Sequence, residues 1–302
     1  MRFHAILLIR DEEDIIEQCL RHTLTWCDAI YVYDTGSTDQ TWDIVREFSG
    51  QDERIIPFQK QPTVFHNGLR AYVFDKYRER MENGDWVLRI DADELYHILP
   101  PTFVQTRVKK SETCVYNQSY DFRLTDQDVL DWEEGRDERQ ELISERRRYY
   151  FPLIISEPRM FRYRQTIKWY PTDSFPRNAG YVARERIPIC HYPHRDPEQL
   201  KRRCYLRSMM TSAQDPGRQH WTVRDWQDLI IDKNTENLCY WELNSPLPEY
   251  HFYNHVAKFP KRLLQRIVHA SMLPIIDRLK PEFPKSYKPE LINSEEERKN
   301  EC

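Results

Sequence analysis

The chain has 302 residues and a formal net charge of -4, and 39% of its residues are hydrophobic while 31% are charged. This composition is typical of a globular protein with a strongly hydrated surface, and it excludes a disordered chain. The negative net charge disfavours nucleic acid as a partner, because proteins that follow a phosphate backbone usually carry a positive field. No segment of the sequence is apolar over enough residues to span a bilayer.

Cysteine usage and the first residues predict the compartment. The seven cysteines stand singly, without a Cys-x-x-Cys pair, so neither a zinc ribbon nor a disulfide scaffold is expected. The apolar segment 5–9 is too short for a signal peptide because charged residues follow it. We therefore expect a cytoplasmic protein. Two basic clusters, 146–148 and 201–203, are interpreted as solvated faces.

The first hundred residues alternate short apolar runs with helical stretches, and the chain shows no internal repeat. This pattern is typical of crossover units around a parallel sheet. Strands are predicted at 3–9, 29–33, 54–58 and 86–90, and helices at 13–24, 41–48 and 68–81. We therefore predict an α/β fold with a mixed, mostly parallel sheet flanked by helices.

The pattern changes after residue 101. Strands are predicted at 114–124 and 153–163 around a charged insert at 126–148, helices at 198–213, 223–233 and 261–279, and a loose polar end at 280–302. We divide the chain into a domain of residues 1–195, with halves 1–100 and 101–195, and a helical C-terminal extension of residues 196–302.

Two carboxylates follow the strand predicted at 86–90, in the segment Asp91-Ala92-Asp93. Open α/β sheets place their ligand sites at the carboxyl ends of their strands. Oxygen ligands at this spacing can gather Mn²⁺ or Mg²⁺, which in turn neutralises a diphosphate. A solvated acidic loop is the alternative interpretation of the same spacing.

Polar residues also follow the first two predicted strands. Asp34 stands where a carboxylate can accept hydrogen bonds from a base or ribose, and Asp39 fits the cap of the next helix. Arg10 and Glu12 follow the first strand, where a cation and backbone donors can meet a nucleotide. None of these signals is specific by itself.

Taken together, the three segments 5–13, 33–41 and 84–94 resemble the nucleotide-binding half of family 2 glycosyltransferases, in order and at fitting distances. The resemblance is clearest over residues 3–96 and is only general beyond them. It implies the GT-A fold, a Rossmann-like sheet with the donor nucleotide over the ends of the first strands. It also implies inversion at the anomeric carbon by direct displacement.

The resemblance implies roles for individual residues. Asp34 would contact the base or ribose, Asp39 would support that loop, and Arg70 is similar in place to a basic residue of the family that touches the nucleotide. Asp93 would bind the metal directly, with Asp91 nearer the ribose or bound through water. The residues expected at the nucleotide-sugar site are Arg10, Glu12, Asp34, Asp39, Arg70, Asp91, Ala92 and Asp93.

A third metal ligand and a catalytic base complete the expected site. In enzymes of this fold a distant histidine often binds the metal, and His191 is the candidate, with His194 as the reserve. An inverting transfer needs a carboxylate to accept the proton of the acceptor hydroxyl. The candidates are Asp173, Glu157 and Asp121, of which Asp173 ranks first because it lies in an aromatic loop that can stack on a sugar.

The sequence thus predicts a metal-dependent glycosyltransferase of the hexosyltransferase type. Its donor would be a UDP- or GDP-sugar, and its acceptor a glycan, a lipid-linked glycan or another hydroxyl compound. A catalytically silent scaffold is one alternative, because the base pair typical of the family is not recognisable. A nucleotidyltransferase is another, although the chain has no glycine-rich phosphate loop.

One amphipathic segment leaves the position of the protein relative to a membrane open. The helix predicted at 261–279 carries an apolar stripe beside basic residues. Packing against the catalytic domain is the favoured interpretation of such a stripe. Peripheral contact with an anionic membrane is the alternative.

Overall fold

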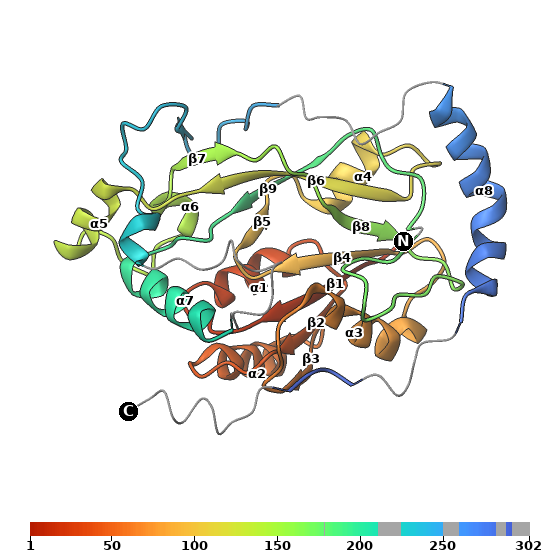
Figure 1. The fold of residues 1–302 in the computed structure, drawn as a ribbon, viewed down its shortest axis with the longest axis horizontal. Helices are drawn as coiled ribbons and strands as arrows, with labels where there is room; N and C mark the ends of the chain where they lie inside the picture. The colour runs from red at the N-terminus through yellow and green to blue at the C-terminus, as the bar shows by residue number, and fades with distance from the viewer. Residues whose placement is uncertain (178, 211–224, 250–259, 282–287, 292–302) are drawn as a thin grey trace.

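A computed structural model describes residues 1–177, 179–210, 225–249, 260–281 and 288–291. Its centre is a ten-stranded sheet (Figure 1). The strands are β1 Phe3–Ile9, β2 Ala29–Asp34, β3 Ile55–Lys60, β4 Trp86–Asp91, β5 Glu94–Tyr96, β6 Cys114–Phe122, β7 Tyr149–Pro152, β8 Pro158–Arg162, β9 Ile187–His191 and β10 Cys239–Tyr240. The α-helices are α1 Ile16–Leu24, α2 Thr41–Gln51, α3 Arg70–Tyr77, α4 Pro100–Arg107, α5 Asp126–Glu133, α6 Ile143–Arg146, α7 Pro197–Met210 and α8 Lys261–Leu279.

The N-terminal half is a parallel sheet in the order β3-β2-β1-β4. Strands β1 and β2 are buried along their whole length, as expected for strands covered by helices on both faces. Leu7 packs in one core cluster with Leu20 of α1 and Val45 of α2, whereas Leu8 packs in the other cluster with Phe74 of α3. Helices α1 and α2 therefore cover one face of the sheet and α3 covers the other.

The second half of the sheet is mainly antiparallel. Strand β8 pairs antiparallel with both β4 and β6, and β6 continues to β7 and β10. Strand β5 leaves the end of β4 and pairs antiparallel with β9, which places Glu94 opposite His191. This pairing brings a strand from residue 187 onwards to the carboxyl end of β4.

The predicted α/β fold class is confirmed, and the elements 3–9 and 261–279 have the predicted bounds. Other details were wrong. Within the strand predicted at 153–163 only β8 is a strand, and residues 153–157, with Ile154 and Ile155 exposed, connect it to β7. The described part of the helix predicted at 223–233 contains only a 3-10 turn, Trp226–Leu229. Helix α4 was not predicted.

The charged insert at 126–148 is also more ordered than its composition indicated. Helix α5 begins with a capping box, in which the side chain of Thr125 accepts from the backbone N–H of Asp128. Arg146 and Arg147 each bond to Asp137 and keep only 1% of their side chains exposed, so the interpretation of this cluster as a solvated face was wrong for both. Their partner Asp137 lies nine and ten residues earlier, within the same charged insert.

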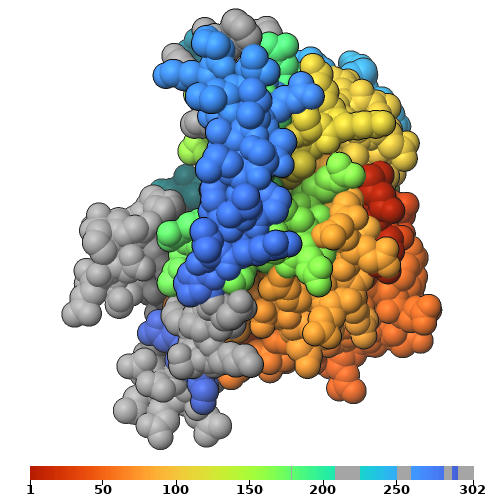
Figure 2. All heavy atoms as spheres, turned by 90° about the vertical axis from the view of Figure 1, so that its right-hand side faces the viewer, coloured from red at the N-terminus to blue at the C-terminus, as the bar shows by residue number. Residues whose placement is uncertain are grey.

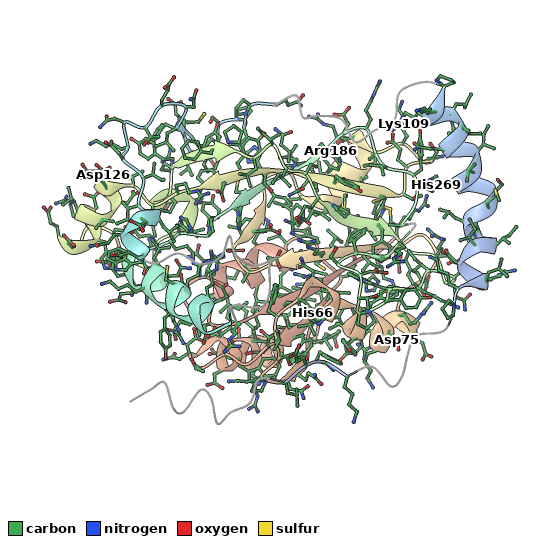
Figure 3. All side chains as sticks on the ribbon, in the orientation of Figure 1. His66, Asp75, Lys109, Asp126, Arg186 and His269 are labelled. Carbon is green, nitrogen blue, oxygen red and sulfur yellow. The ribbon has the colours of Figure 1, made fainter. Side chains whose placement is uncertain are left out.

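Helices α5 and α8 lie at opposite ends of the molecule. Figure 3 shows Asp126 of α5 and His269 of α8 at opposite ends of the longest axis. No helix in the described ranges is both long and apolar enough to cross a membrane. Residues 211–213, 223–224, 282–287 and 292–302, which carry parts of the predicted helices and of the polar end, lie outside the described residues. The division at residue 195 stays a prediction.

Candidate active site

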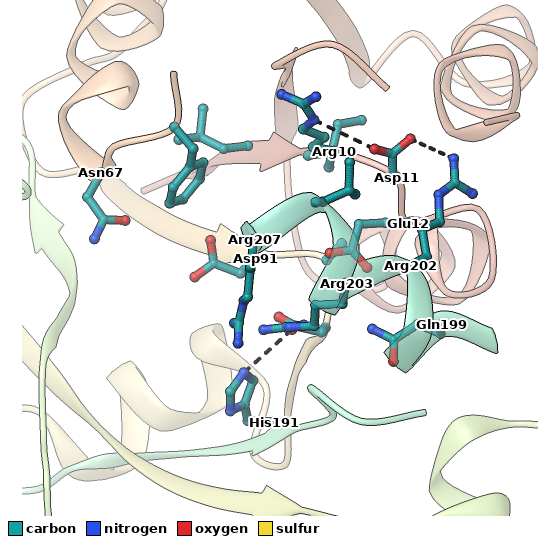
Figure 4. Close-up of a pocket in the computed structure, with 16 residues that line it drawn as sticks. Arg10, Asp11, Glu12, Asn67, Asp91, His191, Gln199, Arg202, Arg203 and Arg207 are labelled. Atoms are coloured by element: carbon teal, nitrogen blue, oxygen red, sulfur yellow. Dashed lines mark hydrogen bonds and ion pairs between the residues drawn. The ribbon is translucent and has the colours of Figure 1, made fainter. Parts of the chain in front are cut away.

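The carboxyl ends of β1, β2 and β4 meet at one edge of the sheet. The register pairs Ile9 with Asp34 and Leu8 with Asp91, so the segments that follow these strands leave the sheet side by side. The segments that follow β1 and β4 border a pocket of about 290 Å³ (Figure 4). The residues predicted for the site that line this pocket are Arg10, Glu12, Asp91, Ala92, Asp93 and His191.

Asp93 lies among three cationic side chains. Its Oδ2 atom is 3.5 Å from Nε2 of His191, 3.3 Å from Nη1 of Arg203 and 4.0 Å from Nη1 of Arg195. Burial by itself would raise the pKa of Asp93, but these neighbours outweigh it and hold the pKa well below its usual range. Asp93 is therefore an anion at neutral pH.

His191 joins Asp93 to a second carboxylate. Its Nδ1 atom lies 2.8 Å from Oδ1 of Asp121, while Nε2 faces Asp93. Burial favours the neutral ring, but the two carboxylates outweigh it and raise the pKa of His191 to about 10. A metal ion at Nε2 would have to displace a proton, because a histidine ligand binds in its neutral form.

Two arginines fix the carboxylate of Asp91. One carboxylate oxygen bonds to Arg70, and the other is 3.1 Å from Nη1 of Arg159. Burial opposes ionisation here too, but Arg70, Arg89 and Arg159 outweigh it and lower the pKa of Asp91 to about 2. Arg70 itself is fully buried behind the pocket wall and does not line the pocket.

Asp34 and Asp39 shape the loop after β2 and do not line the pocket. Oδ1 of Asp34 accepts from the backbone N–H groups of Gly36 and Ser37 at 2.8 and 2.6 Å, and Asp34 has no exposed surface. Gly36 has a φ of +108°, which a residue with a side chain adopts only with strain. Asp39 accepts from the backbone N–H of Thr41 at the start of α2. The predicted contact of Asp34 with the nucleotide stays a prediction.

The three carboxylates proposed as the base lie outside the pocket lining. Asp121 is buried behind His191, and Glu157 bonds to Arg89 with a 2.6 Å distance between Oε2 and Nη2. Oδ1 of Asp173 accepts from Nε of Arg177 at 2.9 Å.

The reserve histidine is also not at the pocket. His194 is 4% exposed, with Nδ1 3.2 Å from Nη1 of Arg123. Burial, with Arg123 and other arginines nearby, lowers the pKa of His194 to about 2, so its ring is neutral. Of the two candidate histidines, only His191 faces Asp93.

Helix α7 supplies pocket residues that sequence reasoning missed. Gln199, Arg202, Arg203 and Arg207 line the pocket (Figure 4). Nη2 of Arg202 is 2.8 Å from Oδ1 of Asp11. The interpretation of 201–203 as a solvated face was therefore wrong for Arg202 and Arg203. The spacing i, i+3, i+4 and i+8 of these polar residues on one helix was the available signal.

The carboxylates and arginines of the pocket favour a ligand that carries negative charge and can bind a cation. Burial and the neighbouring Arg203 lower the pKa of Arg207 to about 10, which still leaves Arg207 charged at neutral pH. Arginine side chains bind phosphate oxygens in bidentate geometry. Carboxylate oxygens opposite them are suited to a divalent cation.

The metal ligands expected from the sequence are only partly assembled. Across the described ranges, no three acidic, histidine or cysteine side chains converge closely enough to hold a metal ion by themselves. Asp93 and His191 offer one oxygen and one nitrogen ligand, a combination that suits Mn²⁺ better than Mg²⁺. The residues fit an ion that takes its remaining ligands from water and from substrate oxygens.

Residues 5–175 match the profile of glycosyl transferase family 2, which is more than half of the chain. The chain therefore belongs to this family. The matched region contains the ends of β1 and β4 that line the pocket, and His191 and α7 lie beyond it. No curated protein matches the sequence.

Several solved structures are distantly similar. The mannosyltransferase PcManGT from Pyrobaculum calidifontis, in complex with GDP-Man and Mn²⁺, is 15% identical over 53% of this chain and 44% of its own, with a TM-score of 0.32. Residues 1–349 of S. aureus TarS are 16% identical over 42% and 36% of the two chains, with a TM-score of 0.27. The CTP:phosphocholine cytidylyltransferase LicC from Streptococcus pneumoniae is 12% identical over 53% and 68%, with a TM-score of 0.26. The chain thus spans less than half of the first two structures.

Proposed function

We propose that this family 2 member transfers a sugar from a nucleoside-diphosphate sugar to a hydroxyl group of a glycan or lipid-linked acceptor, with inversion at the anomeric carbon and dependence on Mn²⁺ or Mg²⁺. One observation carries the proposal: acidic residues after the strands β1 and β4 and arginines of α7 line the same pocket, with Arg203 3.3 Å from Asp93. A diphosphate with a bound cation needs both kinds of side chain, since the cation binds carboxylates and the phosphate oxygens bind arginines.

Different residues would bind the cation and the diphosphate. Asp93 and His191 would hold the ion, which when bound would neutralise the charge that develops on the leaving diphosphate. Arg203 and Arg207 bind phosphate oxygens from the α7 side. Asp121 positions His191, because its bond to Nδ1 fixes the tautomer in which Nε2 is free to act as a ligand.

Asp91 and Arg10 complete the donor side. Asp91 is fixed by Arg70 and Arg159, so its carboxylate has a defined position beside Asp93 before any ligand binds. Preorganised charges stabilise a developing charge without rearrangement at the moment of reaction. Arg10, at the end of β1, adds a cation where the nucleotide would lie.

The test is an assay of product formation on purified protein. UDP- and GDP-sugars are incubated with Mn²⁺, and released nucleoside diphosphate is measured with and without a chelator. Metal-dependent release supports the proposal, whereas formation of a nucleotide sugar and pyrophosphate from a sugar phosphate and a nucleoside triphosphate would identify a nucleotidyltransferase. Binding of a donor without turnover on glycan and lipid-linked acceptors would identify a silent binding protein. No shift of the melting temperature with any nucleoside diphosphate would contradict a donor site altogether.

The placement of Asp173 predicts the outcome of replacing the carboxylate ranked first as the base. Asp173→Asn is expected to leave turnover within about twofold of the parent, because the carboxylate pairs with the exposed Arg177 and not with a group at the pocket. Because Asp173 itself is buried, loss of its charged hydrogen bond is expected to cost about 1–3 kcal/mol in stability. Initial rates and thermal melts, with Asp75→Asn on α3 as the matched control, measure both. Abolished turnover with intact donor binding would instead establish Asp173 as the base.

A further inference from the structure

One face of helix α8 contacts the rest of the protein. Asp277 is fully buried, and its carboxylate accepts from Nε of Arg164 at 2.7 Å and from Nζ of Lys280 at 2.9 Å. Nη2 of Arg262, the second residue of the helix, is 2.6 Å from Oε1 of Glu112. These polar contacts and the buried Leu273 fix the inner side of α8.

The outer side of α8 exposes large apolar side chains. The exposed fractions are 47% for Leu263, 63% for Leu264, 57% for Ile267, 36% for Val268, 50% for Met272, 59% for Ile275 and 81% for Leu279. The spacing 264, 267, 268, 275 places these residues on the face opposite Leu273. Figure 2 shows α8 lying on the surface of the molecule, along the side that faces the viewer. Packing against the catalytic domain, the interpretation favoured from the sequence, is therefore wrong for this face.

The charges of α8 are almost all positive. Lys261, Arg266 and Arg278 are exposed, and none of them has an acidic partner in the part of the chain that the structure describes. Asp277 is the one acid of the helix, and it is buried and paired. A second copy of the chain docked on this face would bring cations against cations. At an anionic lipid surface, by contrast, the exposed apolar side chains of α8 would contact lipid chains and its basic side chains would contact negative headgroups.

We propose that α8 is an amphipathic anchor that lies in the interfacial region of an anionic membrane, with its outer face towards the lipid. Helices α8 and α7 lie at opposite ends of the molecule (Figure 1), so membrane contact at α8 leaves the pocket accessible. The proposal rests on the surface of α8 alone and holds whether or not the pocket transfers a sugar. Large contiguous apolar patches on a folded protein mark interaction sites.

The experiment is co-sedimentation of the full chain with vesicles. Binding is expected to vesicles of phosphatidylcholine that contain about 30% phosphatidylserine. It is expected to weaken when salt is added, because salt screens the charges. It is also expected to weaken with vesicles of pure phosphatidylcholine, which carry no net charge. Ile267→Gln and Ile275→Gln are each expected to weaken binding roughly tenfold or more, because each removes an apolar side chain from lipid contact. Arg278→Gln is expected to weaken binding roughly fivefold on anionic vesicles.

Ile155→Gln is the matched control, because Ile155 is an exposed isoleucine, 73% exposed, in the segment between β7 and β8 and not in α8. It is expected to bind vesicles like the parent. Failure of the parent chain to bind anionic vesicles, or equal binding by the α8 variants, would overturn the proposal. So would a dimer, detected by light scattering, that Ile267→Gln dissociates, because α8 would then be covered by a second copy. Thermal melts of each variant confirm that the fold is retained.

Discussion

Asp93→Asn is expected to lower metal-dependent release of nucleoside diphosphate by at least roughly a thousandfold, which corresponds to about 4 kcal/mol of transition-state stabilisation. Asp93 is the pocket carboxylate nearest His191, and its pKa is held well below the usual range, so the substitution removes an anion from the centre of the site. An amide oxygen is a far weaker ligand for a divalent cation than a carboxylate. Initial rates over a titration of Mn²⁺ measure the loss.

Asp43→Asn on α2 is the matched control for this substitution. Asp43 is exposed and lies outside the pocket, so its replacement is expected to leave both turnover and the Mn²⁺ dependence unchanged. Donor binding by Asp93→Asn, followed by the melting temperature with nucleoside diphosphate alone, separates a catalytic loss from unfolding. Turnover within tenfold of the parent at saturating Mn²⁺ would exclude Asp93 as the metal ligand.

The sequence was sufficient for the part of the site built by parallel strands. Apolar runs at 3–9, 29–33 and 86–90 predicted buried strands, and parallel strands must end at the same edge of a sheet. The position of Asp91 and Asp93 beside Arg10 follows from this rule without any knowledge of side-chain contacts. The prediction for these segments depended on backbone topology, which local patterns determine well.

The sequence was insufficient where the site depends on contacts between distant segments. His191 reaches Asp93 only because β9 pairs with β5, and no local pattern specifies that pairing. In the sequence, the arginines of α7 look like an ordinary run of charged residues. Only the fold brings Arg202 to Asp11 and Arg203 to Asp93. Asp173 ranked first as the base because of its aromatic loop; it pairs with Arg177, four residues away, and does not line the pocket, so its role stays a prediction.

Arg195 was not singled out from the sequence either, and it shows what the same contacts do for stability. It has no exposed surface, and its guanidinium bonds to Glu12 and to Asp14, with 2.5 Å between Nε and Oδ2 of Asp14. It also donates to the backbone oxygen of Tyr192 at 3.1 Å. One side chain thus ties the loop after β1, which lines the pocket, to the segment that joins β9 to α7.

Arg195→Leu is therefore expected to lower the free energy of unfolding by roughly 3–5 kcal/mol, because it leaves buried carboxylates without their cation. For a chain of this size the melting temperature should fall by on the order of 10 °C. Urea unfolding at pH 7 measures the change. Arg21→Gln is the control, since Arg21 pairs with Glu17 on the exposed side of α1 and lies 5.0 Å from the centre of the Phe48 ring, so its loss should cost about 1 kcal/mol or less.

The pH dependence of this loss tests its cause. Burial raises the pKa of Glu12 to about 7, although Arg195 opposes the shift. A carboxyl group whose pKa is raised in the folded protein stabilises the fold below its unfolded pKa, and this stability is lost as the pH rises through the folded value. Removal of Arg195 raises the pKa of Glu12 further, so the deficit of Arg195→Leu should be larger at pH 8 than at pH 5. Equal deficits at both pH values would mean that Arg195 stabilises the fold by packing and not by its charge.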